Sequence, residues 1–504
     1  MNLSHFAYVQ PFNSQTIMKT YVFSFRTVGI NAERVVITVE ASKGEGVTTN
    51  LPDEMSNFLL NNVFASIDRP DMKIDVNIAP FDARDGFRRY ELPVALGILA
   101  ASREDSLPNL DKYVIAGELN YGDVGYIFCD VQCAELAKSL GKGCILPEDS
   151  SKGAATAIRK GVSIMGIRSV DEAIRLVKTN SSFDILMKSA TPYMPTGEEY
   201  DIWTNDVYMS DTARLSAKII AAGGHPAFVS FGARGSFSQM VSYIMPDLTD
   251  EERVECNRQF SIHGYNVLFD HRPHREVGSA GYNTLFGNYS PKRGFVNGEL
   301  ALAHNGVMMF QNVRDLYTDT LEKSIVAYKD KSALVEDEGM EMRYPTDFLP
   351  LFGEMENFIT ERLINEDLAR AKWRRSVLLS SMLSVATLQV GLNGETASKI
   401  ENVLDVRAQV TAARQKQMER QGALNNNASF DVIENSLAKT KKACNALKDF
   451  AVTTIAERGL RDSAYEPVVR MARTIADLNG NDYVSEGDIT TACGFRYLDD
   501  KRLF

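Results

Sequence analysis

The sequence has few of the residues from which metal centres and disulfide frameworks are built. Its 504 residues include six cysteines and six histidines. No CxxC pair occurs among the cysteines, which stand at Cys129, Cys133, Cys144, Cys256, Cys444 and Cys493. A structural zinc site needs about four ligands in compact clusters, so we expect buried, reduced thiols and no metal site. The HxxH pair of His271 and His274 has no partnering carboxylate or cysteine pattern and is interpreted as part of a polar loop.

Net positive charge and long apolar runs are also missing. The 66 acidic and 55 basic residues give a net charge of −11, which argues against a chain built to coat nucleic acid but leaves a local basic patch open. No run of about 18 apolar residues is present, and residues 1–19 lack a charged segment followed by an apolar one. We therefore expect a cytoplasmic, multidomain globular protein without a membrane partner.

What the sequence does contain is an alternation of strand and helix patterns. From residue 19 to residue 180, short β-branched runs such as 33–41 and 73–80 alternate with helical patterns. The stretch 53–67 is amphipathic, and Asp53 is expected to be its N-cap. This block is predicted to be an α+β or α/β domain.

Two flanking segments and two further blocks complete the chain. Residues 1–18 are interpreted as an N-terminal extension, and residues 181–200, with two prolines and several small polar residues, as a linker. In the block 201–375 a buried strand at 226–232 ends in glycine and is followed by a helical pattern, which is how phosphate-binding loops are built. The block 376–504 has helical spacing almost throughout and is predicted to be a C-terminal helical domain.

Strings in all three blocks resemble the ComM/YifB-type magnesium-chelatase-like AAA+ proteins. They include NLPDEMSN and RYELPVALGILAAS in the first block, AAGGHPAFVSFGARGSFSQM and GELALAHNGVMMF in the second, and VRAQVTAARQKQMERQGALN in the third. The resemblance implies an α/β multidomain protein. Its parts would be a Lon-protease-like α+β domain of the ribosomal S5 domain 2-like type, an AAA+ P-loop NTPase-like α/β core and a C-terminal helical lid. Family members are described as hexameric ATPases, and the ComM type as a DNA branch-migration motor.

The nucleotide-binding motif that the resemblance implies is degenerate. In the Walker A loop, GxxxxGK[ST], backbone amides and the lysine hold phosphates while the hydroxyl holds magnesium. Here Phe237 replaces the second glycine, Ser238 the lysine and Gln239 the hydroxyl residue. Arg234 could supply charge from a neighbouring position, which is the less favoured interpretation. The vestigial loop consists of Gly232, Arg234, Gly235, Ser236, Ser238 and Gln239.

The acidic positions of the motif are changed as well. A Walker B strand ends in Asp-Glu, where the Asp orients magnesium and the Glu polarises the attacking water. Here GVMMF is followed by Gln311 and Asn312, which keep the shape of the acids and lose their charge. The stretch DFLPLFGEMENF lacks the family's sensor asparagine, and Ser384 and Val385 stand where Asp and Arg are expected.

The expected arginines of the lid are partly replaced. The family's sensor arginine falls on Ser463, and Arg461, two residues earlier, could partly substitute for it. Arg473 is retained, and a structural and a functional role are equally open for it. Arg407, Arg414, Lys416 and Arg420 lie in one predicted helix, where they form either a DNA-facing stripe or a solvated face, the latter being favoured.

The first block also lacks the residues of a Lon-type protease, which uses a serine nucleophile activated by a lysine. The aligned nucleophile region, 84–91, has no serine, and the lysine region, 125–136, has no lysine. Ser102 and Lys138 lie nearby in sequence, but nothing pairs them. We therefore predict no catalytic residue in either block.

Two hypotheses for function follow. The first is a catalytically inactive ComM-like pseudo-ATPase, a structural or regulatory assembly protein with DNA processing as one candidate role. It needs no cofactor, and ATP with magnesium would enter only if the degenerate site still binds it. The alternative is a nucleotide-binding DNA-processing ring component with weak or partner-dependent ATPase activity, since a helix start after Gly235 attracts phosphate. Either hypothesis predicts a homo-oligomeric ring, with a hexamer as one candidate, or a mixed assembly with an intact paralogue.

Overall fold

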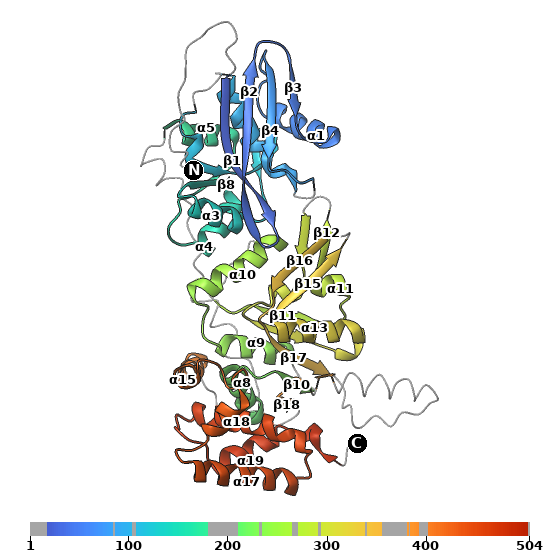
Figure 1. Cartoon of the computed structure of the whole chain (residues 1–504), viewed down its shortest axis with the longest axis vertical. Helices are drawn as coiled ribbons and strands as arrows, with labels where there is room; N and C mark the ends of the chain where they lie inside the picture. The colour runs from blue at the N-terminus through green and yellow to red at the C-terminus, as the bar shows by residue number, and fades with distance from the viewer. Residues whose placement is uncertain are drawn as a thin grey trace, which may run out of the picture. The chain divides into compact units, whose positions relative to one another are not determined.

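The computed structural model describes residues 18–83, 86–102, 107–179, 210–230, 234–264, 271–290, 294–337, 340–354, 381–382, 384–392 and 402–501. The linker predicted at 181–200 and all but the last residue of the predicted N-terminal extension lie outside these ranges. The chain separates into two compact units (Figure 1). Unit 1 consists of Met1–Met194, Asn257–Leu268 and Tyr289–Val296, and unit 2 of Pro195–Cys256, Phe269–Asn288 and Asn297–Phe504.

Unit 1 is built on a seven-stranded mixed sheet in the order β3-β4-β2-β1-β5-β8-β9. The first two strands pair antiparallel along their whole length, from Met18↔Ala41 to Val28↔Asn31. The two strands expected at 33–41 and 73–80 are present and pair with each other. The strands are β1 (Met18–Val28), β2 (Asn31–Ser42), β3 (Gly46–Thr49), β4 (Lys73–Ala79), β5 (Tyr113–Ile115), β8 (Gly143–Pro147) and β9 (Ile164–Ile167), with a hairpin of β6 (Glu118–Asn120) and β7 (Asp123–Gly125).

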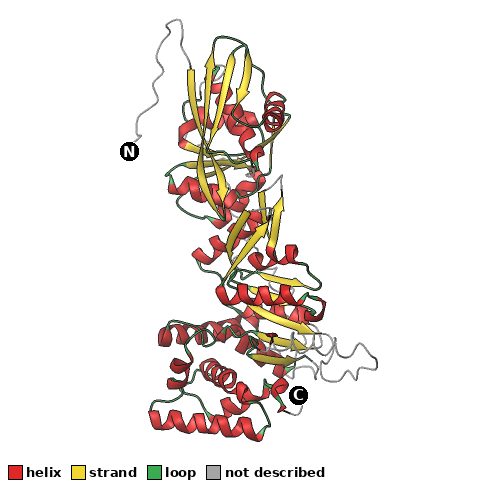
Figure 2. Ribbon diagram, turned by 45° about the vertical axis from the view of Figure 1, so that its right-hand side comes forward, coloured by secondary structure: helices red, strands yellow, loops and turns green. Residues whose placement is uncertain are grey.

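Helices pack against this sheet (Figure 2). They are α1 (Asp53–Phe64), α2 (Glu91–Ala101), α3 (Asp130–Ser139), α4 (Glu148–Ala157) and α5 (Val170–Thr179). Helix α2 is apolar on every side and is buried on every side, as expected for a helix in the core. The prediction that Asp53 caps α1 is wrong, because Pro52 is the N-cap and Asp53 is the first helical residue.

An acidic side chain lies buried where α3 begins. Asp130 accepts a hydrogen bond from the Ser261 hydroxyl, and Ser261 lies in the part of α10 (Asp250–His263) that belongs to unit 1. Burial raises the pKa of Asp130 to about 6, although its hydrogen bonds favour the carboxylate. An acid with a raised pKa in the folded state binds its proton more tightly there than in the unfolded chain. The contribution of Asp130 to stability is therefore present below about pH 4 and is lost as the pH rises through about 6.

We expect Asp130→Asn to remove this pH dependence. The introduced amide cannot ionise but can still accept a hydrogen bond from Ser261. The unfolding free energy of the wild type relative to that of the variant should fall by about 3 kcal/mol between pH 4 and pH 7.5. Denaturant titrations of both proteins across this range measure the difference, and a difference that is constant with pH would contradict the burial of an ionised Asp130.

Unit 2 contains a five-stranded sheet in the order β11-β14-β17-β10-β18, in which all neighbours are parallel. The strands are β10 (Ala227–Ser230), β11 (His274–Val277), β14 (Val307–Phe310), β17 (Leu349–Glu354) and β18 (Leu388–Gly391). The fifth strand lies beyond residue 375, inside the block that sequence analysis placed in the helical domain. Its four residues are too few for periodicity to distinguish a strand from a piece of helix.

Helices and two small hairpins complete the first part of unit 2. The helices are α8 (Asp211–Gly223), α9 (Arg234–Ile244), α11 (Tyr282–Phe286), α12 (Glu299–Leu302) and α13 (Thr318–Asp330), together with the start of α10. The hairpins are β12 (Gly287–Ser290) with β13 (Gly294–Asn297), and β15 (Ser332–Asp337) with β16 (Met340–Pro345). Helix α8 ends at a Gly-Gly pair, because Gly224 caps that helix with a φ of 67°, a conformation that glycine adopts without strain.

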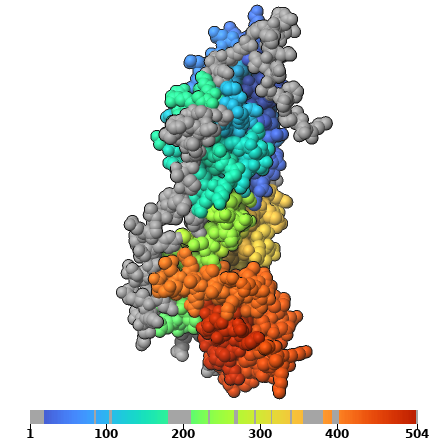
Figure 3. Space-filling view, turned by 90° about the vertical axis from the view of Figure 1, so that its left-hand side faces the viewer, coloured from blue at the N-terminus to red at the C-terminus, as the bar shows by residue number. Residues whose placement is uncertain are grey.

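The C-terminal residues of unit 2 are helical, and their atoms form one continuous block in the space-filling view (Figure 3, orange to red). Helix α19 begins with a capping box between Ser485 and Asp488, a common helix start. The apolar faces of these helices and of the parallel sheet contribute to one core cluster. The helices are α15 (Val403–Gln421), α16 (Phe430–Asn435), α17 (Lys441–Glu457), α18 (Tyr465–Leu478) and α19 (Glu486–Gly494), with the short turns η4 (Asp462–Ala464) and η5 (Tyr497–Asp499).

Candidate functional site

The carboxyl ends of β10, β14 and β17 form the candidate site in unit 2. Strand β10 lies between β17 and β18, whereas the next strand along the chain, β11, lies at the far edge of the sheet. In open α/β sheets, such a reversal of strand order leaves a crevice outside the carboxyl ends of the strands, where ligands bind. The polar residues at this edge are Ser230, Arg234, Gln311, Asn312 and Glu354.

The predicted vestigial loop is largely helical. Strand β10 ends at Ser230 and α9 begins at Arg234, so only residues 231–233 lie between them. Gly232 lies outside the described residues, whereas Gly235, Ser236, Ser238 and Gln239 all belong to α9. A Walker A motif keeps the residues between its two glycines in a loop around phosphate. The residues aligned with the Walker A motif cannot form such a loop, because those from Arg234 to Gln239 are part of helix α9.

The residues aligned with the second glycine and the lysine are in the protein core. Phe237 and Ser238 are fully buried. The Ser238 hydroxyl donates to the Gly235 carbonyl at 2.9 Å and lies 2.8 Å from Nε2 of His274. His274 is the first residue of β11, so Ser238 points toward the amino ends of the strands and away from the crevice. The interpretation of His274 as a loop residue is therefore wrong, since it begins a strand and bonds to the core.

Arg234 is a cationic residue at the start of α9. It is the first residue of α9 and is 7% exposed. Its Nη2 donates to Oδ1 of Asn312 at 3.4 Å, and its Nε has no hydrogen-bond partner among the described residues. Burial lowers the pKa of Arg234, and the negative charge of Glu354 partly opposes that shift. The cation retained at this edge is therefore buried and already engaged with protein groups.

The two amides that replace the Walker B acids also have protein partners. The Gln311 amide group donates to Oε2 of Glu276 at 2.8 Å, and the Asn312 oxygen accepts from Arg234. Gly235 leaves room for this pair, since a Cβ there would lie 3.0 Å from Oε2 of Glu276 and 3.3 Å from Nε2 of Gln311. Magnesium is bound by one or two carboxylates together with substrate phosphates. Neutral Gln311 and Asn312 with a buried Arg234 do not fit magnesium–ATP.

Sequence analysis missed two carboxylates at this edge. Glu354 is the last residue of β17, is 3% exposed and stands in register with Ser230. Glu276 lies in β11 beside Gln311. The stretch DFLPLFGEMENF, which contains Glu354, was interpreted only as lacking the family's sensor asparagine. An acid directly after the apolar run LPLFG is the pattern that could have identified it, because such residues end a parallel strand at the ligand-binding edge.

Other site predictions concern metals, membranes and proteolysis. In the ranges that the structure describes, no group of three or more His, Cys, Asp or Glu side chains could hold a metal ion, and the six cysteines are buried thiols. No helix in those ranges is long and apolar enough to cross a membrane. The Ser102 hydroxyl donates to the Leu99 carbonyl, and no hydrogen bond joins it to Lys138 among the described residues.

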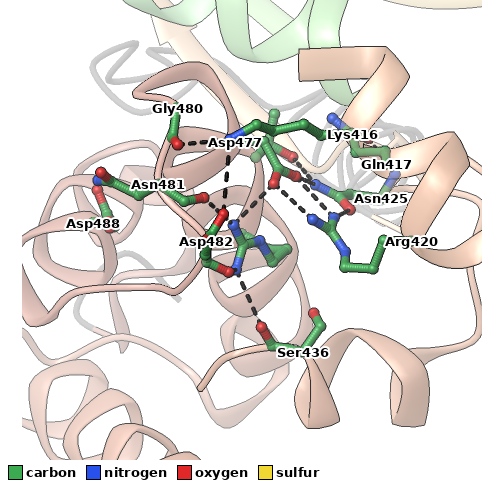
Figure 4. A network of polar contacts seen from close by, with 12 residues as sticks. Lys416, Gln417, Arg420, Asn425, Ser436, Asp477, Gly480, Asn481, Asp482 and Asp488 are labelled. Atoms are coloured by element: carbon green, nitrogen blue, oxygen red, sulfur yellow. Dashed lines mark hydrogen bonds and ion pairs between the residues drawn. The ribbon is translucent and has the colours of Figure 1, made fainter. Parts of the chain in front are cut away.

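Arg473 has a structural role in the helical part of unit 2. Its side chain is fully buried. The guanidinium donates to Oδ1 of Asp477 at 2.8 Å and to the carbonyls of Ser436, Asn481 and Asp482 at 2.9–3.1 Å. Asp477 also accepts hydrogen bonds from Arg420, and these contacts are drawn in Figure 4. Of the two interpretations left open, this geometry favours the structural one.

The second predicted lid arginine lies at a helix start. Arg461 is the N-cap of η4, and its backbone N–H donates to the Asp499 carbonyl at 2.9 Å. Ser463, aligned with the sensor arginine, lies in the same short turn and is exposed.

The basic residues of α15 are half-buried and donate hydrogen bonds to neighbouring helices. Arg407 donates to the Tyr243 carbonyl in α9 at 2.7 Å, and Arg414 to the Ala221 carbonyl in α8 at 2.8 Å. The other two contact α18 and the turn after it, since Lys416 donates to the Gly480 carbonyl and Arg420 to Asp477. A charge pattern on one helix does not reveal which backbone carbonyls lie opposite it.

Three stretches of the chain match families of magnesium chelatase. Residues 51–150 match the family described as "Subunit ChlI of Mg-chelatase", and residues 204–355 the family described as "Magnesium chelatase, subunit ChlI". Residues 401–496 match "Magnesium chelatase, subunit ChlI C-terminal". The second match contains β10, α9 and β14 together with Arg234, Gln311 and Asn312 of the candidate site.

Similar proteins span nearly the whole chain. "Uncharacterized protein YifB" of Salmonella typhimurium is 25% identical over 503 residues, covering 94% of this chain and 96% of its own length. "Competence protein ComM" of Haemophilus influenzae is 23% identical over 514 residues, covering 95% and 97%. A crystal structure of an MCM homolog from Methanopyrus kandleri matches 62% of this chain and 64% of its own at 14% identity and a TM-score of 0.32. Together with the family matches, the relatives show that the chain belongs to the ComM/YifB-type magnesium-chelatase-like AAA+ family.

Proposed function

We propose that this chain is a catalytically inactive AAA+ pseudo-ATPase that acts as a structural or regulatory assembly protein. The observation that carries the proposal is the helix start at Arg234, which leaves only residues 231–233 for a phosphate loop and places Ser238 in the core. Gln311 and Asn312 support it, because both amides are engaged with protein groups at the same edge.

The chemistry of phosphoryl transfer explains why these changes matter together. Catalysis in this class depends on positioning the phosphates and on neutralising the charge that develops during transfer. The metal ligand, the water-polarising glutamate and the phosphate lysine contribute to both in an intact site. Here the first two are neutral amides and the third is a buried serine. Losing even one such group typically costs orders of magnitude in rate.

The assembly role is the finer part of the proposal. We infer a ring-forming homo-oligomer, or a mixed assembly with an intact paralogue, with three segments: a Lon-protease-like domain at 19–180, an AAA+ core at 201–375 and a helical lid at 376–504. The name of the Haemophilus influenzae relative, a competence protein, supports DNA processing as the setting. The alternative, a nucleotide-binding ring component with weak or partner-dependent turnover, retains one supporting observation, the cation at the start of α9.

The purified protein is expected to hydrolyse ATP no faster than buffer, because the two Walker B positions are neutral amides and the lysine position is a buried serine. A phosphate-release assay measures this on the wild type, with Arg234→Ala and Gln239→Ala as paired variants. Turnover that either variant abolishes would overturn the proposal. Mass measurement with and without ATP separates the hypotheses further: a nucleotide-independent oligomer supports an assembly protein, whereas nucleotide-dependent assembly favours the alternative.

A further inference from the structure

Two cysteine side chains meet in the core of unit 1. Cys133 lies in α3 and Cys144 in β8, and both side chains are fully buried. Their sulfur atoms are 3.5 Å apart. The two residues are 11 positions apart in the chain, and the packing of α3 against β8 brings them together (Figure 1). A disulfide holds its sulfur atoms about 2.05 Å apart, so an approach of about 1.5 Å would join this pair.

Burial alone does not give a thiol such a partner. The buried Cys256 thiol donates to the His304 carbonyl at 3.1 Å, and the buried Cys444 thiol donates to the Ala438 carbonyl at 3.2 Å. These two thiols therefore contact backbone groups, which cannot be oxidised together with them. Cys133 contacts a second thiol, the group with which an oxidised cysteine condenses.

Helix α3, which carries Cys133, also binds a part of α10. The Arg258 guanidinium donates to both carboxylate oxygens of Glu135, at 2.6 and 2.9 Å, and the Gln132 side chain donates to the Arg258 carbonyl at 3.1 Å. Arg258 belongs to the segment Asn257–Leu268 of unit 1. A covalent bond from Cys133 to β8 would therefore fix to the sheet the helix on which this segment packs.

We propose that Cys133 and Cys144 form a redox-modification site, at which hydrogen peroxide converts the two thiols to a disulfide that ties α3 to the sheet. The site lies outside the proposed function, since it uses neither nucleotide nor the candidate site of unit 2. In the first step one sulfur attacks the peroxide: a sulfur–oxygen bond forms, the oxygen–oxygen bond breaks, and the released hydroxide takes the thiol proton to become water. The second sulfur then attacks the sulfenic acid, a sulfur–sulfur bond forms, and the sulfenic oxygen leaves as water with the second thiol proton. Both thiols are thereby oxidised and the peroxide is reduced to water.

The surroundings of the pair determine both the rate and the product. Burial raises the pKa of the Cys133 thiol, and so does its contact with Cys144, so little thiolate is present and the first step is slow. The reaction proceeds when α3 opens locally. A sulfenic acid formed at either sulfur has a thiol beside it, and this neighbour reacts before a second peroxide arrives. The expected product is therefore the disulfide and not a sulfinic acid.

The test exposes the folded wild type to hydrogen peroxide, alkylates the remaining thiols after denaturation and counts them by mass spectrometry. The count should fall by two from the six of the untreated protein, and dithiothreitol should restore it. A non-reducing digest should contain peptides joined through Cys133 and Cys144. Cys444→Ala is the matched control, since it removes a buried thiol that contacts backbone carbonyls and should leave the bond intact, whereas Cys133→Ala should abolish it. The amides of α3 should exchange hydrogen at least about tenfold more slowly in the oxidised wild type than in the reduced protein.

Six free thiols after treatment would overturn the proposal if they are found both in buffer and at a denaturant concentration just below the unfolding transition, where local opening admits peroxide. A disulfide from either cysteine to another residue overturns it as well, as does a sulfinic acid at Cys133 in the wild type. Equal exchange of the α3 amides in the two redox states contradicts the tie to the sheet. If Cys133→Ala does not fold, Cys144→Ala removes the other sulfur and should likewise form no bond.

Discussion

Replacing Arg473 by alanine is expected to lower the free energy of unfolding of unit 2 by about 3–5 kcal/mol. Its guanidinium joins Asp477 to the carbonyls of three residues that lie outside α18. Asp477 keeps Arg420 as a partner, so most of the loss comes from the carbonyls of Ser436, Asn481 and Asp482 and from the cavity that the large side chain leaves.

Thermal or denaturant unfolding measures this effect, and hydrogen exchange of the α18 amides shows where it acts. Arg458→Ala is the control, because Arg458 is exposed at the end of α17 and such surface changes usually shift stability by about 0.5 kcal/mol or less. A loss below about 1 kcal/mol for Arg473→Ala would contradict a structural role and reopen a functional one.

Gly306→Ala is expected to destabilise unit 2 by about 3 kcal/mol or more, at the upper end of what overpacking costs. A Cβ at this position would lie 2.0 Å from the Pro273 carbonyl oxygen and 2.8 Å from its carbon. Pro273 directly precedes β11. In the same region the Val307 N–H donates to the Pro273 carbonyl, and the Leu349 N–H donates to the Gly306 carbonyl. The backbone must therefore shift at the point where β11, β14 and β17 begin.

Gly278→Ala is a matched control for this substitution, since Gly278 lies just beyond β11 and a Cβ there would meet nothing within 4 Å. The two variants can be compared by their midpoints of denaturant unfolding. Similar midpoints for both would contradict the close approach of Gly306 to Pro273.

Local patterns predicted much of the fold. The strands expected at 33–41 and 73–80 are present as β2 and β4. Both depend on residues close together in the chain. Asp53 shows the limit of local rules, because Pro52 already supplies the extended residue that precedes the helix.

The candidate site depended on strand register and was predicted only in part. The replacement of acids by Gln311 and Asn312 was recognised from the sequence. The place of Glu354 at the same edge was not, because it requires β17 to lie between β14 and β10. Ser238 was expected at the phosphate, and the early start of α9, at Arg234, places it in the core. An alignment fixes which residue replaces another, and the length of the preceding connection decides where that residue lies.

The polar contacts of α15 have an energetic consequence. Carbonyl groups at the ends of helices carry partial negative charge and have no partner within their own helix. Arg407 and Arg414, on one helix, supply cationic donors to the ends of α9 and α8, and Gln409 donates to the last carbonyl of α18 at 3.1 Å. Opening α15 would therefore expose three helix ends at once. Helices on both sides of residue 375 then belong to a single cooperative unit, and separating them at that point in a truncated protein would cut through a unit of folding.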